Sequence, residues 1–241
     1  MTTCPAKPPC ISSPSPNHSR RPNSRIDTIV LHATAGGYEG SLAWLIDPRS
    51  RVSAHYLINK QGLCHQLVPD SEKAWHAGRS AFRGEYGVNA FSIGIELVNA
   101  NDGRDAYPEE QVRACAELCA HLCYAHHIPR DRITSHYTIS HALQGKTDPK
   151  HFPWERFSSI FREAIGDVGR DVLVLDDRES DVPLHRVGDR LFADADRLAA
   201  AVGFDDWEFE PPNAEVEAVS FLEDLGFSVT RSGVRLVASR G

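Results

Sequence analysis

The stretch Phe91-Ser92-Ile93-Gly94-Ile95-Glu96-Leu97-Val98 decides the fold class of this chain. It is nearly all apolar, which is typical of a strand buried at the centre of a sheet. The carboxylate of Glu96 interrupts it, and local inconsistencies of this kind tend to fall at functional sites. The alternative, which the residues alone leave open, is a glutamate on a solvated face or at the sheet edge.

Short apolar runs on both sides of this stretch predict the other strands of the sheet. They lie at residues 26–32, 52–59, 63–68 and 133–136, and the second and third are joined by a turn that makes them a hairpin. Helices are predicted at residues 42–46, 107–127 and 154–165, and residues 137–151 are predicted to form a loop. The alternation of strands and helices indicates an α/β or α+β domain.

Composition divides the chain into three parts. Residues 1–24 are rich in proline and serine and are predicted to be a flexible leader, because such a segment buries too little apolar area to offset the entropy of ordering. Residues 25–166 form the main domain. Residues 167–241 are predicted to be a small α+β accessory unit, without a set of chemically reactive residues. Its expected elements are two helices at 191–202 and 215–225 and a terminal hairpin at 227–237.

Charge and hydropathy limit the classes of partner. The net charge of −7 at pH 7 argues against a nucleic-acid partner held by phosphate contacts. The sequence has no run of about 18 apolar residues that would predict a membrane span, and its N-terminus lacks the apolar core of a signal peptide. We therefore expect synthesis in the cytoplasm without a cleaved export signal, and a monomer is the favoured oligomeric state.

The six cysteines do not have the pattern of a disulfide framework. Cys115, Cys119 and Cys123 recur every fourth residue on one face of a predicted helix, where free cysteine behaves as a small apolar residue. Metal binding by these three thiols would require other elements to close around them. The other cysteines lie in the leader and in a predicted strand, so we expect free thiols and a reducing compartment.

Three residues that are distant in the sequence are candidates for a metal site. His32 and His136 each end a predicted strand, and Asp148 lies in the polar loop Lys146-Thr147-Asp148-Pro149. Two imidazoles and one carboxylate are a usual protein ligand set of a catalytic zinc ion, which keeps its fourth position for water. Their spacing matches no short metal motif, so the residues alone also allow ordinary surface or core positions.

Two further residues could complete a hydrolytic site. Zinc lowers the pKa of a bound water and polarises a carbonyl. Hydrolysis of an amide also needs a proton carrier, for which an embedded carboxylate such as Glu96 is suited, and a cation such as Lys146 that stabilises the oxyanion. Lys146 is two residues from Asp148, so in an extended loop both side chains point to the same side.

With these residues in place, the chain resembles a known family, the type-2 N-acetylmuramoyl-L-alanine amidases, whose fold is shared with peptidoglycan recognition proteins and phage T7 lysozyme. The resemblance covers about residues 26–157 and is greatest to the AmpD and AmiD branch. Five motifs in the order of the family carry it: Val30-Leu31-His32-Ala33-Thr34, Val52-Ser53-Ala54-His55-Tyr56-Leu57-Ile58, Ala74-Trp75-His76-Ala77-Gly78, Asn89-Ala90-Phe91-Ser92-Ile93-Gly94-Ile95-Glu96-Leu97 and Lys146-Thr147-Asp148-Pro149.

The resemblance implies an α/β fold with a mixed central sheet flanked by helices, and it implies a role for each matching residue. His32, His136 and Asp148 match the zinc ligands. Glu96 matches the catalytic carboxylate, and Lys146 matches the lysine that stabilises the transition state. The implied substrate is peptidoglycan or a muropeptide. The implied reaction is hydrolysis of the amide between the lactyl group of N-acetylmuramic acid and L-Ala of the stem peptide, with zinc as the cofactor.

The same motifs suggest substrate contacts and a branch of the family. Trp75, His76 and Asn89 are candidates for contact with the substrate, and wall or packing roles are the alternative. Asp148 stands where the T7 branch and many recognition proteins have cysteine, and Ala54 stands where the T7 branch has a catalytic tyrosine. Both departures indicate the branch in which the glutamate carries the proton.

A zinc amidase is therefore the leading hypothesis. A non-catalytic peptidoglycan-binding module is the first alternative, and it is disfavoured because no expected ligand is missing. A regulator that binds another protein rests only on analogy with the T7 enzyme. The tail would be a wall-anchoring module or a structural lid. The enzyme would act on the cell wall after release, as a phage endolysin does, or on muropeptides in the cytoplasm.

Overall fold

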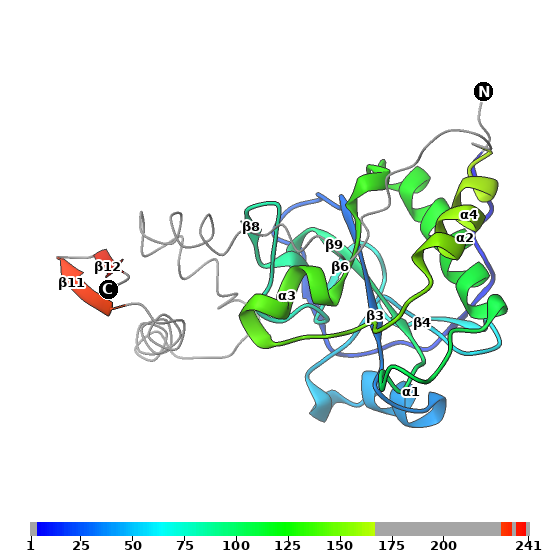
Figure 1. Ribbon diagram of the computed structural model, residues 1–241, viewed down its shortest axis with the longest axis horizontal. Helices are drawn as coiled ribbons and strands as arrows, with labels where there is room; N and C mark the ends of the chain where they lie inside the picture. The colour runs from blue at the N-terminus through cyan, green and yellow to red at the C-terminus, as the bar shows by residue number, and fades with distance from the viewer. Residues whose placement is uncertain (1–3, 167–227, 233–234, 240–241) are drawn as a thin grey trace.

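The stretch that decides the fold class forms strand β9, Ser92–Leu97, in a computed structural model that describes residues 4–166, 228–232 and 235–239. β9 lies inside a six-stranded mixed sheet with helices on both faces, so the predicted α/β class is confirmed (Figure 1). The strands follow one another across the sheet in the order β1 (Cys10–Ser12), β5 (Cys64–Gln66), β4 (Tyr56–Ile58), β9, β3 (Thr28–Ala33) and β10 (Ile133–Ser135).

Strand direction explains where a site can form. β4, β9, β3 and β10 run parallel, β5 returns antiparallel to β4 as the predicted hairpin requires, and β1 pairs parallel with β5. The carboxyl ends of the parallel strands therefore meet at one edge of the sheet, where ligands of open α/β sheets bind. His32 lies near the end of β3, and His136 follows β10 directly.

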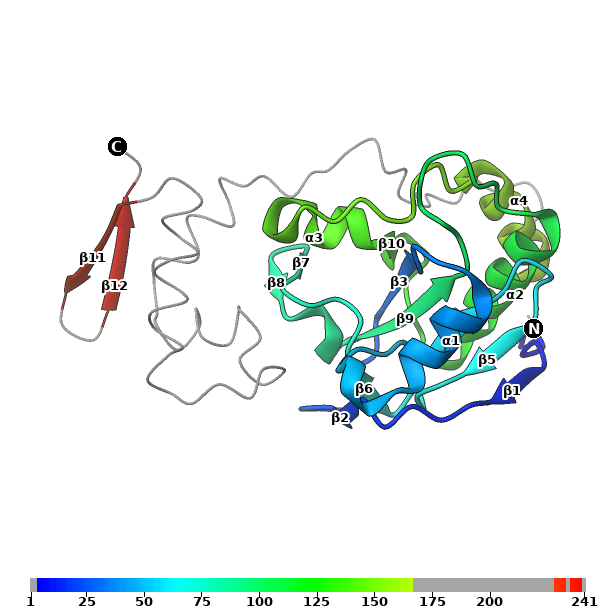
Figure 2. The same cartoon turned by 90° about the horizontal axis from the view of Figure 1, so that it is seen from below.

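Four α-helices of the described part of the chain cover the sheet. They are α2 (Glu109–Ala125) and α4 (Trp154–Ala164) side by side on one face, and α1 (Tyr38–Ile46) and α3 (His136–Gln144) on the other (Figures 1 and 2). Ile29, Leu31 and Ile95 pack in the apolar layer under α2 and α4, which also holds the three buried cysteines predicted on one face of α2. Val30 lies in the layer under α3, and Leu57 packs with residues of α1.

The register of β3 and β9 places His32 directly beside Glu96. Successive side chains of a strand point to opposite faces, so both residues share the face of Val30, under α1 and α3. One ligand candidate and the proton-carrier candidate thus lie next to each other on the sheet, before any loop is considered.

One helix was not predicted, and another begins earlier than predicted. The first half of the predicted loop 137–151 is helix α3, because the Ser135 hydroxyl accepts a hydrogen bond from the Thr138 N–H at 3.1 Å and caps it. Gly145 ends α3 in the left-handed conformation with φ 67°. α1 begins at Tyr38 rather than at residue 42, with Gly37 as its N-cap.

The segment predicted to be a flexible leader is ordered where the structure describes it, which differs from the prediction. It supplies β1 to the main sheet and β2 to a small antiparallel pair with β6. Cys10 and Cys64 lie opposite each other in β1 and β5 and form a disulfide, so the expectation of free thiols is wrong at these two positions. Arg21 is also buried, and its guanidinium donates to the backbone oxygens of Asp70 and Ser92.

The remaining described elements are short. They are β2 (His18–Arg20), β6 (Glu72–Ala74), β7 (Ala81–Phe82), β8 (Glu85–Tyr86) and three 3-10 turns at Pro48–Ser50, Val88–Ala90 and Arg130–Arg132. β11 (Ser228–Ser232) and β12 (Arg235–Ser239) pair antiparallel, as the predicted terminal hairpin requires. The predicted helices at 191–202 and 215–225 lie outside the described residues. Among the described helices, none combines the length and apolarity needed to cross a membrane.

Candidate active site

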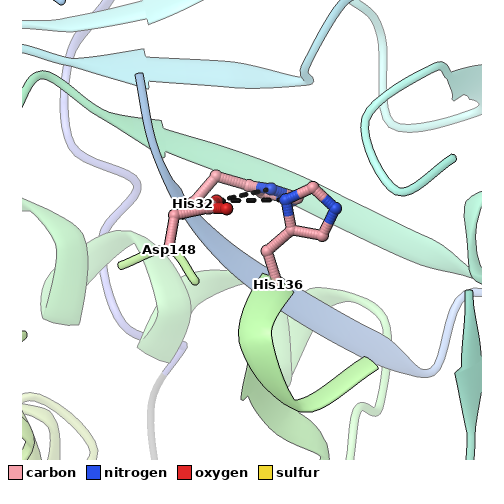
Figure 3. Close-up of side chains that lie close together, drawn as sticks. All are labelled: His32, His136 and Asp148. Carbon is pink, nitrogen blue, oxygen red and sulfur yellow. Dashed lines mark hydrogen bonds and ion pairs between the residues drawn. The ribbon is translucent and has the colours of Figure 1, made fainter. Parts of the chain in front are cut away.

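Three side chains from separate segments meet at the carboxyl edge of the sheet (Figure 3). His32 comes from β3, His136 opens α3, and Asp148 comes from the loop after α3. Asp148 Oδ2 lies 3.0 Å from His136 Nδ1 and 3.6 Å from His32 Nδ1. The Asp148 carbonyl accepts a hydrogen bond from the Tyr137 N–H at 2.8 Å, which ties the loop back to the first turn of the helix.

This donor set fits a zinc ion. Ligands bound tetrahedrally at about 2.0–2.2 Å lie about 3.3–3.6 Å from one another, close to the observed separations. His32 Nδ1 is buried and has no hydrogen-bond partner among the described residues. Burial, followed by the adjacent His136, lowers the pKa of His32 to about 4, so its imidazole is neutral at pH 7, as metal binding requires.

Asp148 is held as a carboxylate. Burial alone would raise its pKa, but the contacts with His136 and His32 outweigh that effect and keep the pKa well below its ordinary value. A carboxylate oxygen beside two imidazoles is a ligand combination that suits a divalent cation.

Glu96 lies beside the three ligand candidates and lines the same cleft. Burial, followed by the negative charge of Asp148, raises the pKa of Glu96 to about 8, and Lys146 opposes this shift. Its Oε2 atom is buried and accepts no hydrogen bond from the described residues. A carboxyl group with a pKa near the working pH is suited to take up and release a proton. β9 lies inside the sheet and Glu96 is only partly exposed, so the alternative of a glutamate at the sheet edge does not apply.

The cleft over these residues has a volume of about 560 Å³. Lys146 is exposed at its rim, and its backbone oxygen accepts a hydrogen bond from His141 Nδ1 at 2.8 Å. Trp75, a candidate for substrate contact, lines the cleft, and its indole N–H donates to the Ser19 hydroxyl at 3.2 Å. The site therefore combines a polar floor of candidate metal ligands with a partly aromatic wall.

His76 and Asn89 lie in places that favour the packing alternative. The His76 ring is only 8% exposed and lies behind His32, with its Nδ1 2.9 Å from His32 Nε2. Asn89 is 2% exposed and is not among the residues that line the cleft. Its Oδ1 accepts hydrogen bonds from the backbone N–H groups of His76 and Ala77 at 3.1 and 2.8 Å. Asn89 therefore fixes the backbone of the loop that carries Trp75 and His76.

The structure adds two residues to the cleft that sequence reasoning did not single out. Trp44 of α1 is 57% exposed, and Val52 is 38% exposed, and both line the cleft. The sequence placed Trp44 in a helix, but only the packing of that helix on the sheet decides which of its side chains face the site. Large exposed apolar side chains at the rim of a polar cleft are typical of ligand contact.

Comparison with known families gives one match that covers most of the main domain. The family model described as N-acetylmuramoyl-L-alanine amidase matches residues 22–151. The amidase AmiD from Escherichia coli is 37% identical over 149 residues, which are 56% of this chain and 52% of AmiD. The 1,6-anhydro-N-acetylmuramyl-L-alanine amidase AmpD from Haemophilus influenzae is 35% identical over 171 residues, which are 62% of this chain and 91% of AmpD. The chain thus spans about half of AmiD and nine-tenths of AmpD.

Solved structures of AmpD and AmiD are also similar to this chain. A crystal structure of an AmpD derivative has a TM-score of 0.58 and 29% identity, with 66% of this chain and 98% of that chain covered. A complex of AmiD from E. coli with the substrate anhydro-N-acetylmuramic acid-L-Ala-D-γ-Glu-L-Lys has a TM-score of 0.51 and 36% identity. That comparison covers 56% of this chain and 57% of the AmiD chain.

Proposed function

The chain belongs to the N-acetylmuramoyl-L-alanine amidase family, and we propose that it is a zinc-dependent amidase of peptidoglycan or its fragments. The bond cleaved is the amide between the lactyl group of N-acetylmuramic acid and L-Ala of the stem peptide. The observation that carries the proposal is the convergence of His32, His136 and Asp148 beside Glu96 in one cleft. The AmiD complex with an anhydro-muropeptide substrate supports the same substrate class.

The residues divide the chemistry among them. His32, His136 and Asp148 would hold the zinc ion, which when bound supplies a water of lowered pKa and polarises the carbonyl. Glu96 takes the proton from the attacking water and delivers it to the nitrogen of L-Ala as the carbon–nitrogen bond breaks. The ammonium group of Lys146 at the rim stabilises the negative charge on the carbonyl oxygen.

The walls of the cleft suit a substrate that is part sugar and part peptide. Trp75, Trp44 and Val52 give apolar surface above the polar floor. Sugar rings have apolar faces that pack on aromatic side chains, and the hydroxyl and amide groups of the substrate stay hydrated or contact the rim. We propose that Trp75 and Trp44 contact the substrate directly, whereas Asn89 supports the loop that carries Trp75.

The test compares the full chain with its Glu96→Ala variant. The wild type is expected to contain zinc by elemental analysis and to release free stem peptide from anhydro-muropeptide, as measured by mass spectrometry. Glu96→Ala is expected to keep zinc and to lose about 10²–10⁴-fold in rate. Undiminished release would refute the role of Glu96, and a metal-free protein that binds peptidoglycan without cleaving it would instead be a binding module.

The same assay on intact sacculi addresses the biological setting. An enzyme that acts on the wall after release, as an endolysin does, is expected to release stem peptides from sacculi as well as from soluble muropeptide. An enzyme of muropeptide turnover in the cytoplasm is expected to cleave only the soluble substrate.

A further inference from the structure

A chain of hydrogen bonds leads from His32 into the interior of the domain. His32 Nε2 lies 2.9 Å from His76 Nδ1, and His76 Nε2 lies 3.1 Å from the Ser92 hydroxyl. The Ser92 hydroxyl donates in turn to the backbone oxygen of Val88 at 2.6 Å. His32, His76 and Ser92 are 1%, 8% and 0% exposed, so bulk water does not compete for these contacts.

The backbone oxygen of Val88, which ends this series of hydrogen bonds, fixes the direction of each bond in the series. A carbonyl oxygen only accepts, so the single hydroxyl proton of Ser92 points at Val88. Ser92 Oγ must then accept from His76, which places the proton of that ring on Nε2. The ring is buried, and its two nitrogens contact His32 and Ser92, neither of which is an anion that would stabilise a second proton, so the ring carries one proton.

The same logic passes to His32. A neutral His76 with its proton on Nε2 has a bare Nδ1, which accepts from His32 Nε2–H. A neutral His32 with its proton on Nε2 has a bare Nδ1, and this is the atom that faces Asp148 at 3.6 Å. A backbone oxygen thus selects, through two side chains, the nitrogen of His32 that is free to bind a metal.

The position of the His76 ring is itself strongly determined. Asn89 Oδ1 accepts from the backbone N–H of His76. A Cβ atom added to Gly94 of β9 would lie 2.4 Å from His76 Cγ, so only glycine at that strand position leaves room for the ring. Arg21 donates to the backbone oxygens of Asn89 and Ser92 at 3.2 and 2.8 Å. These hydrogen bonds hold in place the segment from which the Asn89 and Ser92 side chains reach His76.

We propose that His76 is a positioning residue that, together with Ser92, fixes the tautomer and the ring orientation of His32 so that Nδ1 faces the metal site. Partners of this kind behind a metal ligand set its tautomer and basicity. The inference deepens the proposed function and rests on it for the identity of the metal, but the tautomer of His32 can be measured without metal.

The first experiment is ¹⁵N NMR of the histidine rings in the metal-free, full-length protein. The His32 signal is identified by its loss in His32→Gln, and in the wild type it is expected to show a proton on Nε2. In His76→Leu the acceptor is gone, so the proton is expected to move to Nδ1, where Asp148 can accept it. His76→Asn offers an amide oxygen in place of Nδ1 and is expected to restore the wild-type tautomer.

The second experiment measures zinc affinity by competition with a chromophoric chelator. His76→Leu is expected to bind zinc about 10–100-fold more weakly than the wild type, and His76→Asn to recover most of that loss. His65→Leu is the matched control, because His65 is 4% exposed and contacts Tyr38 and Ser13 rather than a candidate ligand. This control is expected to change stability without changing the His32 tautomer or zinc affinity.

The outcomes separate the inference from the proposed function. A wild-type protein that binds no zinc overturns the zinc amidase proposal, and the NMR measurement still decides the role of His76. A proton on Nδ1 of His32 in the wild type, or a His32 tautomer unchanged in folded His76→Leu, overturns the inference. Should His76→Leu misfold, Ser92→Ala removes only the hydroxyl that orients His76, and an unchanged tautomer there overturns it equally.

Discussion

The pKa of Glu96 couples the active site to the stability of the fold. It rises from an ordinary value of 4.5 to about 8 in the folded state, chiefly through burial. Between these values the folded chain keeps a proton that the unfolded chain releases, so this carboxyl group favours folding less and less as the pH rises through that window. Preorganising a proton carrier thus costs stability at neutral and alkaline pH.

Glu96→Gln is therefore expected to stabilise the metal-free protein in a pH-dependent way. The variant keeps the shape of the side chain and removes the ionisation, so its stability relative to the wild type should grow from about pH 5 to pH 8. Urea unfolding at several pH values measures this difference. A difference that stays constant with pH would contradict a raised pKa at position 96.

Lys146 and Asp148 are two residues apart, but their removal is expected to have different effects on zinc content and activity. Asp148→Ala should lose zinc and activity together, because it removes an anionic ligand. Lys146→Ala should keep zinc and lose about 10²–10³-fold in kcat, because the exposed ammonium acts on the transition state alone. Zinc content and kcat of both variants are the measurements, and matching behaviour would show that the proposed division of roles is wrong.

At the scale of elements, the N-terminal segment is part of the domain rather than an appendage. Arg21 is 6% exposed, and its guanidinium donates to four backbone oxygens, those of Asp70, Asn89, Ala90 and Ser92. Burial lowers its pKa to about 10, so it stays charged at neutral pH, and the nearby Asp70 and Glu72 compensate part of this cost.

Arg21→Met is expected to lower the free energy of unfolding by about 2–4 kcal/mol, because it leaves several buried carbonyl groups without a donor. The neighbouring exposed Arg20 gives the matched control, and Arg20→Met should change stability by less than about 0.5 kcal/mol. Urea denaturation of both variants tests this. Equal stability of the two would mean that the segment contributes nothing to the fold.

The elements that the sequence predicted well are those that local pattern determines. β3, β9, the β4–β5 hairpin, α2 and α4 each have an apolar run or a helical face that is buried wherever the element packs. The start of α3 at His136 was missed because Ser135 was not recognised as its cap. The order in the leader was missed because its partners, Cys64 and the carbonyl acceptors of Arg21, lie 54 or about 50–70 residues away in the sequence.

The candidate site likewise has a part that the sequence predicted and a part that it did not. His32, His136, Asp148, Glu96 and Lys146 were identified by their chemistry and by resemblance to a family. The structure brings the last four to the lining of one cleft and buries His32 beside them. The sequence motif around His76 indicated that this residue lies near the site, but it did not indicate which way the ring faces. Whether that ring faces the substrate or the back of His32 depends on Gly94 across the sheet, and no local pattern contains that information.

For the whole molecule, the proposed division into a catalytic domain and an accessory unit makes a separate prediction. All the candidate site residues lie between His32 and Asp148. A chain that ends at residue 166 is therefore expected to keep its zinc and its kcat/KM on soluble muropeptide. If residues 167–241 anchor the enzyme to the wall, the same chain should no longer sediment with sacculi. Loss of activity on the soluble substrate would instead make the tail part of the catalytic unit.

The disulfide between Cys10 and Cys64 has a consequence for self-association. It fastens β1, a strand of only three residues, over β5. Pro8 and Pro9 precede β1 and Pro14 follows it, and because proline has no N–H, another chain cannot extend the ladder along this margin. Without the disulfide, β1 would be held on β5 mainly by the few hydrogen bonds between the two strands. Release of β1 would expose β5 as a template for intermolecular strand pairing. We therefore expect the reduced protein to aggregate more readily than the oxidised protein.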